Sequence, residues 1–528
     1  MEKENREISR RSFIKYATAG AAGVGDLGAL DGFSSNKETI KGESEKIQVS
    51  KIMTADIVVV GGGASGLCAA LQAGSDGAKV ILLESASSLG GNSKGTEGLF
   101  AADSAMQKEA GIKILFREII GSEQEYFHYI TNALFWKDLM TASGPNISWL
   151  AQNGVRFSGK VDNYKGLGGQ IKCYHWWEGK ATPYLVEPLS AKAKEVGVNI
   201  MLNTAAKDLI MSNGKVTGVY ATAYDKSTIQ INSGAVILAT GGYVDNNKMM
   251  EERGYDMSRI MVLGFSGHNG DGLRMAIAAG GRDVSEKKCF LKEPFAKGLG
   301  FMGNINQTIL NSGSCLWVNQ HAERYTNENC GVVHPGNRSN AVLSQTKSFC
   351  IFDQAILDYL DKNSSTTTVA KEGLISEVDK ALAENKSQNI YKADSIEELA
   401  KKVGLAPDAL EATIARYNSL CQQGVDDDFN KPKANMLAIS KTPYYIIRQD
   451  LAFMASIGGI AINRNMQVIN KKGEPIPGLY SAGVDGCELY GDTYTINVPG
   501  SAMAHCVYSG RTAAQNALKA MKAVGEKA

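Results

Sequence analysis

The sequence predicts an α/β fold in which buried parallel strands alternate with helices. The first observation is the apolar run Ile57 to Val60, which is followed by a glycine-rich turn and a helical stretch that ends near Gly77. The second is another apolar run, Lys79 to Leu83, where the returning strand of a βαβ unit would lie. The third is size, because 528 residues with 44% hydrophobic composition can form a large core and a ligand cleft.

Charge and cysteine content argue against several classes of protein. The 56 Lys and Arg residues nearly balance the 55 Asp and Glu residues, so the formal net charge is +1 and no nucleic-acid partner is expected. The nine cysteines form no CxxC pair, which argues against c-type haem attachment, ferredoxin-like clusters and zinc ribbons. We expect no metal site. No run of about 18 apolar residues occurs, so we do not expect the chain to span a membrane.

The amino terminus has the pattern of a targeting segment. Residues 9 to 15 read Ser-Arg-Arg-Ser-Phe-Ile-Lys, and small residues follow as far as Leu30. Paired arginines before a mildly apolar stretch are typical of a twin-arginine export signal. A basic helix start is the alternative. We assign residues 1–35 to the signal and 36–51 to a linker, and expect an exported protein of the periplasm or cell envelope.

The first glycine turn has the spacing of a dinucleotide-binding fingerprint. Gly61 allows the tight turn, Gly63 lets the backbone approach a pyrophosphate, and Gly66 lets the helix pack closely on the strand. The helix start also offers free N–H groups to phosphate oxygens. Glu84 ends the second strand 18 residues beyond Gly66, where its carboxylate can bind a ribose.

Two later turns indicate which dinucleotide is bound. Gly90-Gly91-Asn92-Ser93 comes soon after the ribose acid, and Ala239-Thr240-Gly241-Gly242 follows an apolar strand at 235–238. No second GxGxxG fingerprint occurs, which argues against a separate nicotinamide domain. One Rossmann-like unit with a later ATGG turn favours FAD over NAD.

Taken together, six segments resemble a known family. They read VVVGGGASGLCAA, ESASSLGGNS, VILATGGY, GHNGDGLRMAIAAGG, PIPGLYSAG and PGSAMAHCVYSGRTAA. The chain is similar to the flavoprotein subunits of fumarate reductase and succinate dehydrogenase over roughly residues 52 to 520. The closer likeness is to the soluble exported fumarate reductases, whose relatives include 3-ketosteroid dehydrogenases and enoate reductases.

The resemblance implies a Rossmann-like FAD-binding domain with an inserted α+β capping domain. We therefore expect the FAD domain at 52–284 and 446–520, the capping domain at 285–445 and a tail at 521–528. Within the cap, Ser395 to Glu398 forms a capping-box pattern that predicts a helix start. A second helix is expected from about Pro407 to Cys421.

The resemblance also implies which residues contact FAD. Besides the fingerprint glycines, Ser65 in the phosphate turn and Glu84, the matching positions are Asn92, Ser93, Glu97, Gly98, Ala206, Thr240, Asp271, Gly483, Ser501, Ala502 and Met503. Membrane-bound members of the family tether FAD through a histidine after the GGN segment. This chain has Lys94-Gly95-Thr96 there, so we expect the FAD to be bound non-covalently.

The expected substrate site departs from the fumarate pattern. The family's two carboxylate-binding arginines match Asn311 and Asn497, and the histidine before the Gly458-Gly459 pair matches Ala455. The family's HPT segment matches the stretch Cys289 to Phe295, which has no histidine. A dicarboxylate needs cationic clamps at both ends, so it is not the expected substrate.

Neutral and aromatic residues take the place of the arginines. We expect Tyr490, Tyr494, Asn497 and Asn311 to face the flavin, with His175 and Trp176 nearby. Amide and phenol groups can bind a carbonyl or hydroxyl, and aromatic rings bury apolar area. Packing between domains is the alternative explanation for the tryptophans at 176 and 177.

The proton donor has three candidates. In the family an arginine shortly after an R-F-x-N-E segment protonates the substrate carbon. Here Arg324 to Glu328 matches that segment, and Arg338 is the first arginine beyond it. Tyr494 is the second candidate, because tyrosines act in the ketosteroid branch. His334 is the third.

These residues predict an FAD-dependent reductase of an activated C=C bond. The expected substrate is an α,β-unsaturated carbonyl compound that is neutral or monoanionic and partly aromatic or polycyclic. FAD would supply hydride and a protein acid the proton. Electrons would come from an external cytochrome or flavin-bearing redox protein, in anaerobic respiration. Three alternatives stay open: a ketosteroid-type dehydrogenase working in the oxidative direction, a fumarate-type dicarboxylate reductase, and a non-catalytic flavin carrier.

Overall fold

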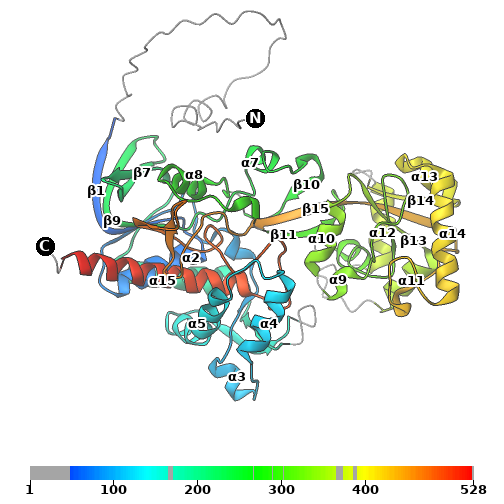
Figure 1. Ribbon diagram of the computed structural model, residues 1–528, viewed down its shortest axis with the longest axis horizontal. Helices are drawn as coiled ribbons and strands as arrows, with labels where there is room; N and C mark the ends of the chain where they lie inside the picture. Colours follow the sequence, from blue (N-terminus) through cyan, green and yellow to red (C-terminus); the bar gives the residue numbers. More distant parts are fainter. Residues whose placement is uncertain are drawn as a thin grey trace, which may run out of the picture.

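The computed structural model describes residues 48–164, 171–265, 267–287, 289–300, 303–333, 335–363, 373–384 and 389–525. The predicted signal segment, most of the linker and His334 lie outside this range. Figure 1 shows two unequal bodies, a main domain and a smaller cap domain, joined by the long strand β15 (Tyr444–Ser456).

The main domain is built on an eight-stranded mixed sheet. Its principal order is β16-β17-β9-β1-β2-β6, and β7 and β8 extend it from β9. The strands are β1 (Lys51–Val60), β2 (Val80–Leu83), β6 (Asn199–Met201), β7 (Ala205–Ser212), β8 (Lys215–Thr222), β9 (Thr228–Leu238), β16 (Gln467–Ile469) and β17 (Pro475–Ser481). β1 pairs in parallel with both β2 and β9, so their carboxyl ends meet at one edge. The predicted strand, turn, helix and strand unit is confirmed.

Helices cover this sheet. α2 (Ala64–Ser75) connects β1 to β2, and the long C-terminal α15 (Ser501–Gly525) packs along it. Gly510 makes this approach possible, because a Cβ there would lie 2.3 Å from the Ser65 carbonyl oxygen. The other helices of the main sheet region are α6 (Glu187–Glu195), α7 (Asn247–Glu251) and α8 (Asp271–Ala278).

A small lobe extends from the main domain at the bottom of Figure 1. It contains a three-stranded sheet in the order β3-β5-β4 and three helices. Its elements are β3 (Gly98–Phe100), β4 (Phe157–Asp162), β5 (Tyr174–Trp177), α3 (Ala105–Glu109), α4 (Phe116–Tyr126) and α5 (Ala133–Gln152). β3 follows the Gly90 turn directly, so this lobe lies beside the candidate cofactor site.

The cap domain contains a second sheet that is organised around β15. The first half of β15 pairs with β13 and β14, and the second half pairs with β10 and β11. The strands are β10 (Ile260–Val262), β11 (Phe290–Phe295), β12 (Leu316–Asn319), β13 (Ser348–Asp353) and β14 (Ile390–Ala393). The helices are α9 (Cys330–Val333), α10 (Pro335–Leu343), α11 (Gln354–Asn363), α12 (Leu374–Glu384), α13 (Ile396–Val403) and α14 (Pro407–Gln423).

The two cap helices predicted from sequence are present. The Ser395 hydroxyl accepts a hydrogen bond from the Glu398 N–H at 3.1 Å and starts α13. The Glu398 side chain forms an ion pair with Lys402 at 2.8 Å. α14 begins at Pro407 as expected and ends two residues beyond Cys421. The expected domain boundary at 445/446 falls inside β15, because this strand continues without interruption from the cap into the main domain.

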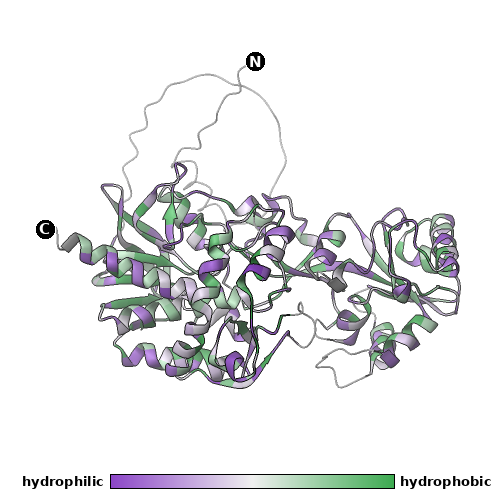
Figure 2. Cartoon of the chain, turned by 60° about the horizontal axis from the view of Figure 1, so that its bottom comes forward, coloured by the Kyte–Doolittle hydropathy of each residue, from purple (hydrophilic) through white to green (hydrophobic). Residues whose placement is uncertain are grey.

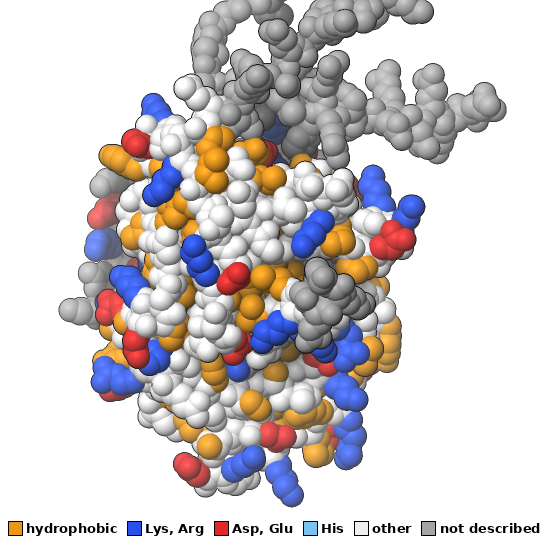
Figure 3. All heavy atoms as spheres, turned by 90° about the vertical axis from the view of Figure 1, so that its left-hand side faces the viewer, with side chains coloured by type: hydrophobic (Ala, Val, Ile, Leu, Met, Phe, Trp, Pro, Cys, Tyr) orange, Lys and Arg blue, Asp and Glu red, His pale blue; other side chains and the backbone are white. Residues whose placement is uncertain are grey.

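Polarity follows this architecture. Hydrophobic residues run along the inner strands, while hydrophilic residues concentrate on loops and outer helix faces (Figure 2). β1, β2 and β9 have fully buried ends, such as Ile57, Leu82 and Val236 at 0% exposure. On the face shown in Figure 3, side chains of both charges are interspersed, in keeping with the near-zero net charge.

Candidate functional site

A cavity of about 390 Å³ opens where the parallel strands end. This edge of an α/β sheet is where such folds bind ligands. Of the predicted cofactor residues, those that line the cavity are Gly61, Gly63, Ser65, Glu84, Asn92, Ser93, Ala206, Thr240, Asp271, Ala502 and Met503. Gly66, Glu97, Gly98, Gly483 and Ser501 are not among the lining residues.

The glycine turn forms one wall of the cavity. Gly61 has φ +105°, and a Cβ there would lie 2.2 Å from the Ala239 carbonyl oxygen, so the turn requires glycine. Gly66 contributes by packing, since its Cβ would lie 1.8 Å from the Gly61 oxygen. The N-cap residue Gly63 offers no side-chain acceptor to the first turn of α2. The N–H groups there therefore suit a phosphate.

Glu84 is fixed at the end of β2 by two backbone groups. Its carboxylate accepts hydrogen bonds from Gly62 N–H at 2.8 Å and from Ala86 N–H at 2.7 Å. The side chain lines the cavity beside the glycine turn. This is the position from which an acid can bind the ribose of a dinucleotide.

The segment after Gly90 is hydrogen-bonded to two distant parts of the chain through Asn92. The Asn92 amide donates to the Met454 carbonyl at 2.9 Å and accepts from Phe265 N–H at 2.8 Å. Lys94, at the position of the family's tethering histidine, donates to the Ser88 hydroxyl at 2.8 Å. Glu97 accepts a hydrogen bond from the Tyr164 hydroxyl at 2.9 Å.

Five further predicted cofactor positions lie around α15 and β3 or in the turn at Gly483. Gly98 belongs to β3, whose backbone pairs with Trp176. Gly483 donates its N–H to the Ser509 hydroxyl at 2.8 Å. Ser501 begins α15 and shares a 2.8 Å hydrogen bond with Tyr490, while Ala502 and Met503 face the cavity.

Asp485 is a functional candidate that the sequence analysis missed. Its buried carboxylate accepts from the Thr240 hydroxyl at 2.8 Å, from Gly242 N–H at 2.7 Å and also from Thr240 N–H. Burial raises the pKa of Asp485, and these hydrogen bonds oppose the rise. The carboxylate thus holds the turn that lines the cavity next to Gly61.

The second candidate that the sequence analysis missed is the pair Asp245 and His268. His268 lines the cavity, is 7% exposed, and has Nδ1 3.5 Å from the Asp245 carboxylate. Asp245 also accepts from the Gly267 and His268 N–H groups, each at 2.9 Å. A histidine before the Asn-Gly-Asp-Gly segment, with an acid three residues after Gly242, is the sequence signal that could have found this pair.

The predicted substrate residues gather from several segments. The rings of Tyr490 and Tyr494 are 5.1 Å apart, and burial raises the pKa of both phenols. Arg338, on α10, donates to the Asn311 carbonyl at 3.2 Å and lies 3.7 Å from the Glu293 carboxylate. The structure therefore brings Arg338 and Asn311 together in the cap and the two tyrosines together in the main domain.

Two of these side chains keep unpaired polar atoms. Within the described ranges, Asn311 Oδ1 and Arg338 Nε are buried without a hydrogen-bond partner. Burial lowers the pKa of Arg338, while Glu293 opposes this change. A buried guanidinium with a free N–H can bind a polar substrate group or donate a proton.

Contacts also join α10 to the loop 490–498, and no residue of either segment lines the cavity described above. Asn340 donates to the Thr493 hydroxyl at 2.7 Å. The Tyr126 hydroxyl on α4 lies 3.3 Å from Asn337 Oδ1 and 3.5 Å from the Tyr494 carbonyl. Three parts of the chain therefore meet at the loop that carries Tyr494 and Asn497.

His175 and Trp176 have different environments. His175 is fully buried, and its ring nitrogens contact the Ser104 hydroxyl at 2.7 Å and the Cys173 carbonyl at 3.1 Å. Burial lowers its pKa to about 4, so the ring is neutral. Trp176 stacks on Tyr164 at 5.5 Å and donates to Asp162 at 2.9 Å. Both substrate assignments stay predictions.

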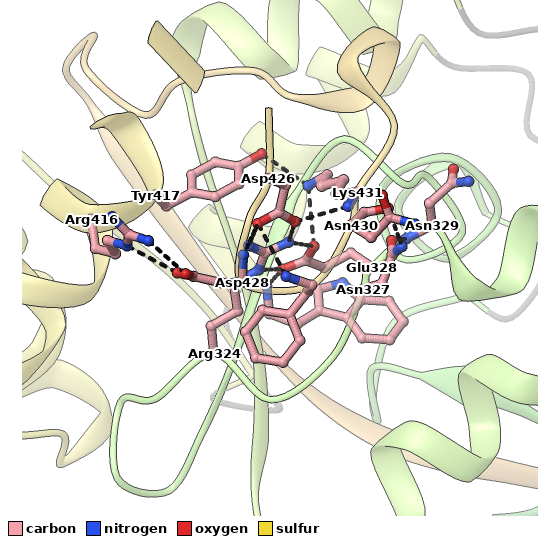
Figure 4. A network of polar contacts seen from close by, with 12 residues as sticks. Arg324, Asn327, Glu328, Asn329, Arg416, Tyr417, Asp426, Asp428, Asn430 and Lys431 are labelled. Atoms are coloured by element: carbon pink, nitrogen blue, oxygen red, sulfur yellow. Dashed lines mark hydrogen bonds and ion pairs between the residues drawn. The ribbon is translucent and has the colours of Figure 1, made fainter. Parts of the chain in front are cut away.

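A buried ionic network anchors the segment before Arg338 (Figure 4). Arg324 binds Glu328 through two hydrogen bonds of 2.9 Å and Asp426 through bonds of 2.9 and 2.7 Å. Lys431 adds a 3.3 Å contact to Glu328. Burial raises the pKa of Asp426, but hydrogen bonds from Arg324 outweigh it and bring the pKa to about 2. Two cations and two anions thus fix the chain that leads into α9 and α10.

No group of three or more metal-binding side chains occurs among the residues that the structure describes. In the same part of the chain, no helix has the length and apolar character needed to cross a membrane.

Comparison with known proteins agrees with this geometry. Residues 56–497 match the family model described as FAD binding domain. The chain is 34% identical to a vinyl phenol reductase of Lactiplantibacillus plantarum over 88% of this chain and 96% of that protein. It is 29% identical to a cytochrome-type fumarate reductase of Shewanella frigidimarina over 89% of this chain and 78% of that protein.

A solved structure shares the fold. The open form of a flavocytochrome c3 fumarate reductase superposes with a TM-score of 0.66 at 23% identity, covering 98% of this chain and 83% of that chain. The glycine cradle, the ribose acid and the family match all fit FAD. The chain therefore belongs to the FAD-binding flavoprotein family of the fumarate reductases, and it is an FAD-dependent oxidoreductase that acts on CH–CH groups.

Proposed function

We propose that this enzyme reduces an activated C=C bond conjugated to an aromatic ring or a carbonyl group, in a substrate that is neutral or carries one negative charge. The observation that carries the proposal is the aromatic character of the predicted substrate residues. The rings of Tyr490 and Tyr494 lie 5.1 Å apart, and those of Tyr174 and Trp176 lie 4.8 Å apart, although none of the four lines the cofactor cavity. Aromatic side chains that contact a substrate favour a flat apolar one.

Two further points support an aromatic substrate. The matched vinyl phenol reductase acts, by its name, on a vinyl group attached to a phenol. Asn311 and Asn497 occupy the positions where the sequence comparison expects the arginines of fumarate reductases. Without those two cations, a second substrate carboxylate would enter the site unpaired and at a desolvation cost.

The residues of the chain have distinct tasks in this proposal. When bound, FAD supplies the hydride that is added to one carbon of the double bond. Arg338 holds a proton at its guanidinium and gives it to the other carbon, with Tyr494 as the second candidate. Asn497 and Asn311 orient the polar end of the substrate, and α10 and the loop 490–498 exclude water.

Further proposals concern cofactor attachment, electron supply and location. Lys94 replaces the tethering histidine, so we propose that FAD is bound non-covalently. Without a CxxCH haem motif in this sequence, a separate cytochrome or flavin-bearing protein would deliver electrons. Arg10 and Arg11 support export by the twin-arginine route. A role in anaerobic respiration is part of the same proposal.

Reoxidation of the reduced protein tests the function. Purified protein is reduced anaerobically with viologen and mixed with 4-vinylphenol, cinnamates, steroid enones or fumarate. We expect rapid reoxidation by an aromatic alkene or enone and slow reoxidation by fumarate. If fumarate is the fastest oxidant, the substrate proposal is wrong. If saturated ketones reduce a quinone-like dye while no alkene reoxidises the protein, the enzyme is a dehydrogenase. If neither reaction occurs, it is a flavin carrier.

A further inference from the structure

Glu123 on α4 is a buried acid that has no part in the proposed proton and hydride transfers. Glu123 is 0% exposed, and within the described residues neither carboxylate oxygen has a hydrogen-bond partner. Burying an ionised carboxylate without a partner is costly, so such a group is either neutral or functional. Glu123 therefore needs an explanation beyond packing.

Glu123 lies next to the loop 490–498, which carries several of the predicted substrate residues. The side chains of Thr495 and Asn497 face its carboxyl group. One turn further along α4, Tyr126 contacts the Tyr494 carbonyl at 3.5 Å and Asn337 on α10 at 3.3 Å. α4 thus supports the substrate loop and the helix that carries Arg338 from behind.

Among the residues that the structure describes, no cation compensates the charge that Glu123 would carry. Burial raises its pKa from 4.5 to about 8, and Thr495 and Asn497 oppose this rise only in part. The titratable groups that interact with it are Tyr126 on its own helix and Cys173 ahead of β5, and neither is cationic. The acid is therefore protonated at neutral pH.

We propose that Glu123 is a positioning residue that acts on the substrate through Asn497. A protonated carboxyl can donate its O–H to the Asn497 amide oxygen. The Asn497 NH₂ group then points its donors toward an oxygen of the substrate. An ionised Glu123 would instead accept from that NH₂ group and turn the amide oxygen toward the substrate. The inference rests on the proposed function and adds a preference for substrates that accept a hydrogen bond from Asn497.

This arrangement has a chemical consequence. Adding hydride to an activated alkene builds negative charge on the conjugated group, and a fixed donor there stabilises the transition state. Glu123 supports catalysis in its protonated form only. Activity should fall as the pH rises through about 8. A group that must lose a proton to act would give the opposite pH dependence.

The first experiment measures the proton itself, independently of turnover. The infrared spectrum of the FAD-loaded protein at neutral pH should contain the carbonyl band of a buried protonated acid. The Glu123→Gln variant should lack this band. Glu125→Gln, which changes an exposed acid on the same helix, should keep it. Absence of the band from the wild-type protein would overturn the proposal.

The second experiment measures kcat/KM with 4-vinylphenol across the pH range on the same three proteins. Above pH 8 the wild type and Glu125→Gln should lose about tenfold per pH unit relative to Glu123→Gln, whose amide can donate to Asn497 at every pH. Substrate ionisation affects all three equally, so the ratios isolate Glu123. Parallel profiles would overturn the positioning role. Failure of every alkene to react would count against the proposed function, and the infrared band would still decide the state of Glu123.

Discussion

The cofactor cradle and the substrate site of this protein are built in different ways. The cradle consists mainly of backbone turns at the ends of β1, β2 and β9, and its two central glycines lie five residues apart at Gly61 and Gly66. The predicted substrate site draws on α4, α10, the cap segment at Asn311 and the loop 490–498, which contact one another. A turn imposes strict local requirements on the sequence, while a site made of distant side chains imposes few.

The cradle should be least tolerant where backbone approaches backbone. Gly66→Ala would place a Cβ 1.8 Å from the Gly61 oxygen, so we expect loss of bound FAD and destabilisation of more than about 3 kcal/mol. Thermal unfolding and the FAD content of the purified protein measure both effects. The control is Gly121→Ala on α4, where nothing lies within 4 Å, and which should stabilise by up to about 1 kcal/mol. Equal behaviour of the two variants would contradict the role of the close approach.

Substitutions in the predicted substrate site should lower turnover and leave the fold and the FAD content unchanged. If Arg338 is the proton donor as proposed, Arg338→Met should lower turnover by about 10²- to 10⁴-fold, with FAD content unchanged. Tyr494→Phe is measured alongside it, and the exposed Arg117→Met serves as the control. Turnover near that of the wild type in the Arg338 variant would transfer the donor role to Tyr494, provided that Tyr494→Phe is slow.

Asp485 tests whether side chains also matter in the cradle. Asp485→Ala leaves the buried N–H groups of Thr240 and Gly242 without their acceptor, at a cost of roughly 1–3 kcal/mol for each unpaired group. We expect a lower melting temperature and weaker FAD binding, measured by fluorescence titration. Asp208→Ala, at an exposed position on β7, should change neither. A silent Asp485 variant would show that the turn holds its shape without this acid.

Glu123 links the predicted substrate site to the pH dependence of stability. The folded protein keeps its proton up to about pH 8, while the unfolded chain loses it near 4.5. Between these values the folded state binds the extra proton, so this group lowers stability by about 1.4 kcal/mol for each unit of rising pH. Urea unfolding across this range should show the slope in the wild type and a reduced slope in Glu123→Gln. Identical slopes would mean that the acid is already ionised.

Sequence reasoning succeeded where the determinants are local. The strand at 57–60, its glycine turn, the helix after it and the helices from Ser395 and Pro407 all follow from neighbouring residues. The sequence shows no break near 445, because β15 is one continuous strand that runs from the cap towards the main domain.

Asp485 and Glu123 were missed for a different reason from Asp245 and His268, which a sequence signal could have found. Asp485 acts on a turn 245 positions earlier in the chain, and Glu123 faces Thr495 and Asn497, which follow it by more than 370 positions. Both are single acids without a motif around them, and only burial distinguishes them from surface carboxylates. Glu97 is assigned to the cofactor from the family resemblance; its carboxylate accepts a hydrogen bond from Tyr164, and the cofactor contact stays a prediction.

β15 also couples the two bodies mechanically. The strand runs from the cap sheet to Ser456, and the Met454 carbonyl near its end holds the Asn92 side chain at the cavity wall. A rotation of the cap would displace this strand, and the hydrogen bond between Met454 and Asn92 would transmit the movement to the cofactor pocket directly. The absorption and fluorescence of the bound flavin should therefore act as an intrinsic gauge of cap position, readable without any added label.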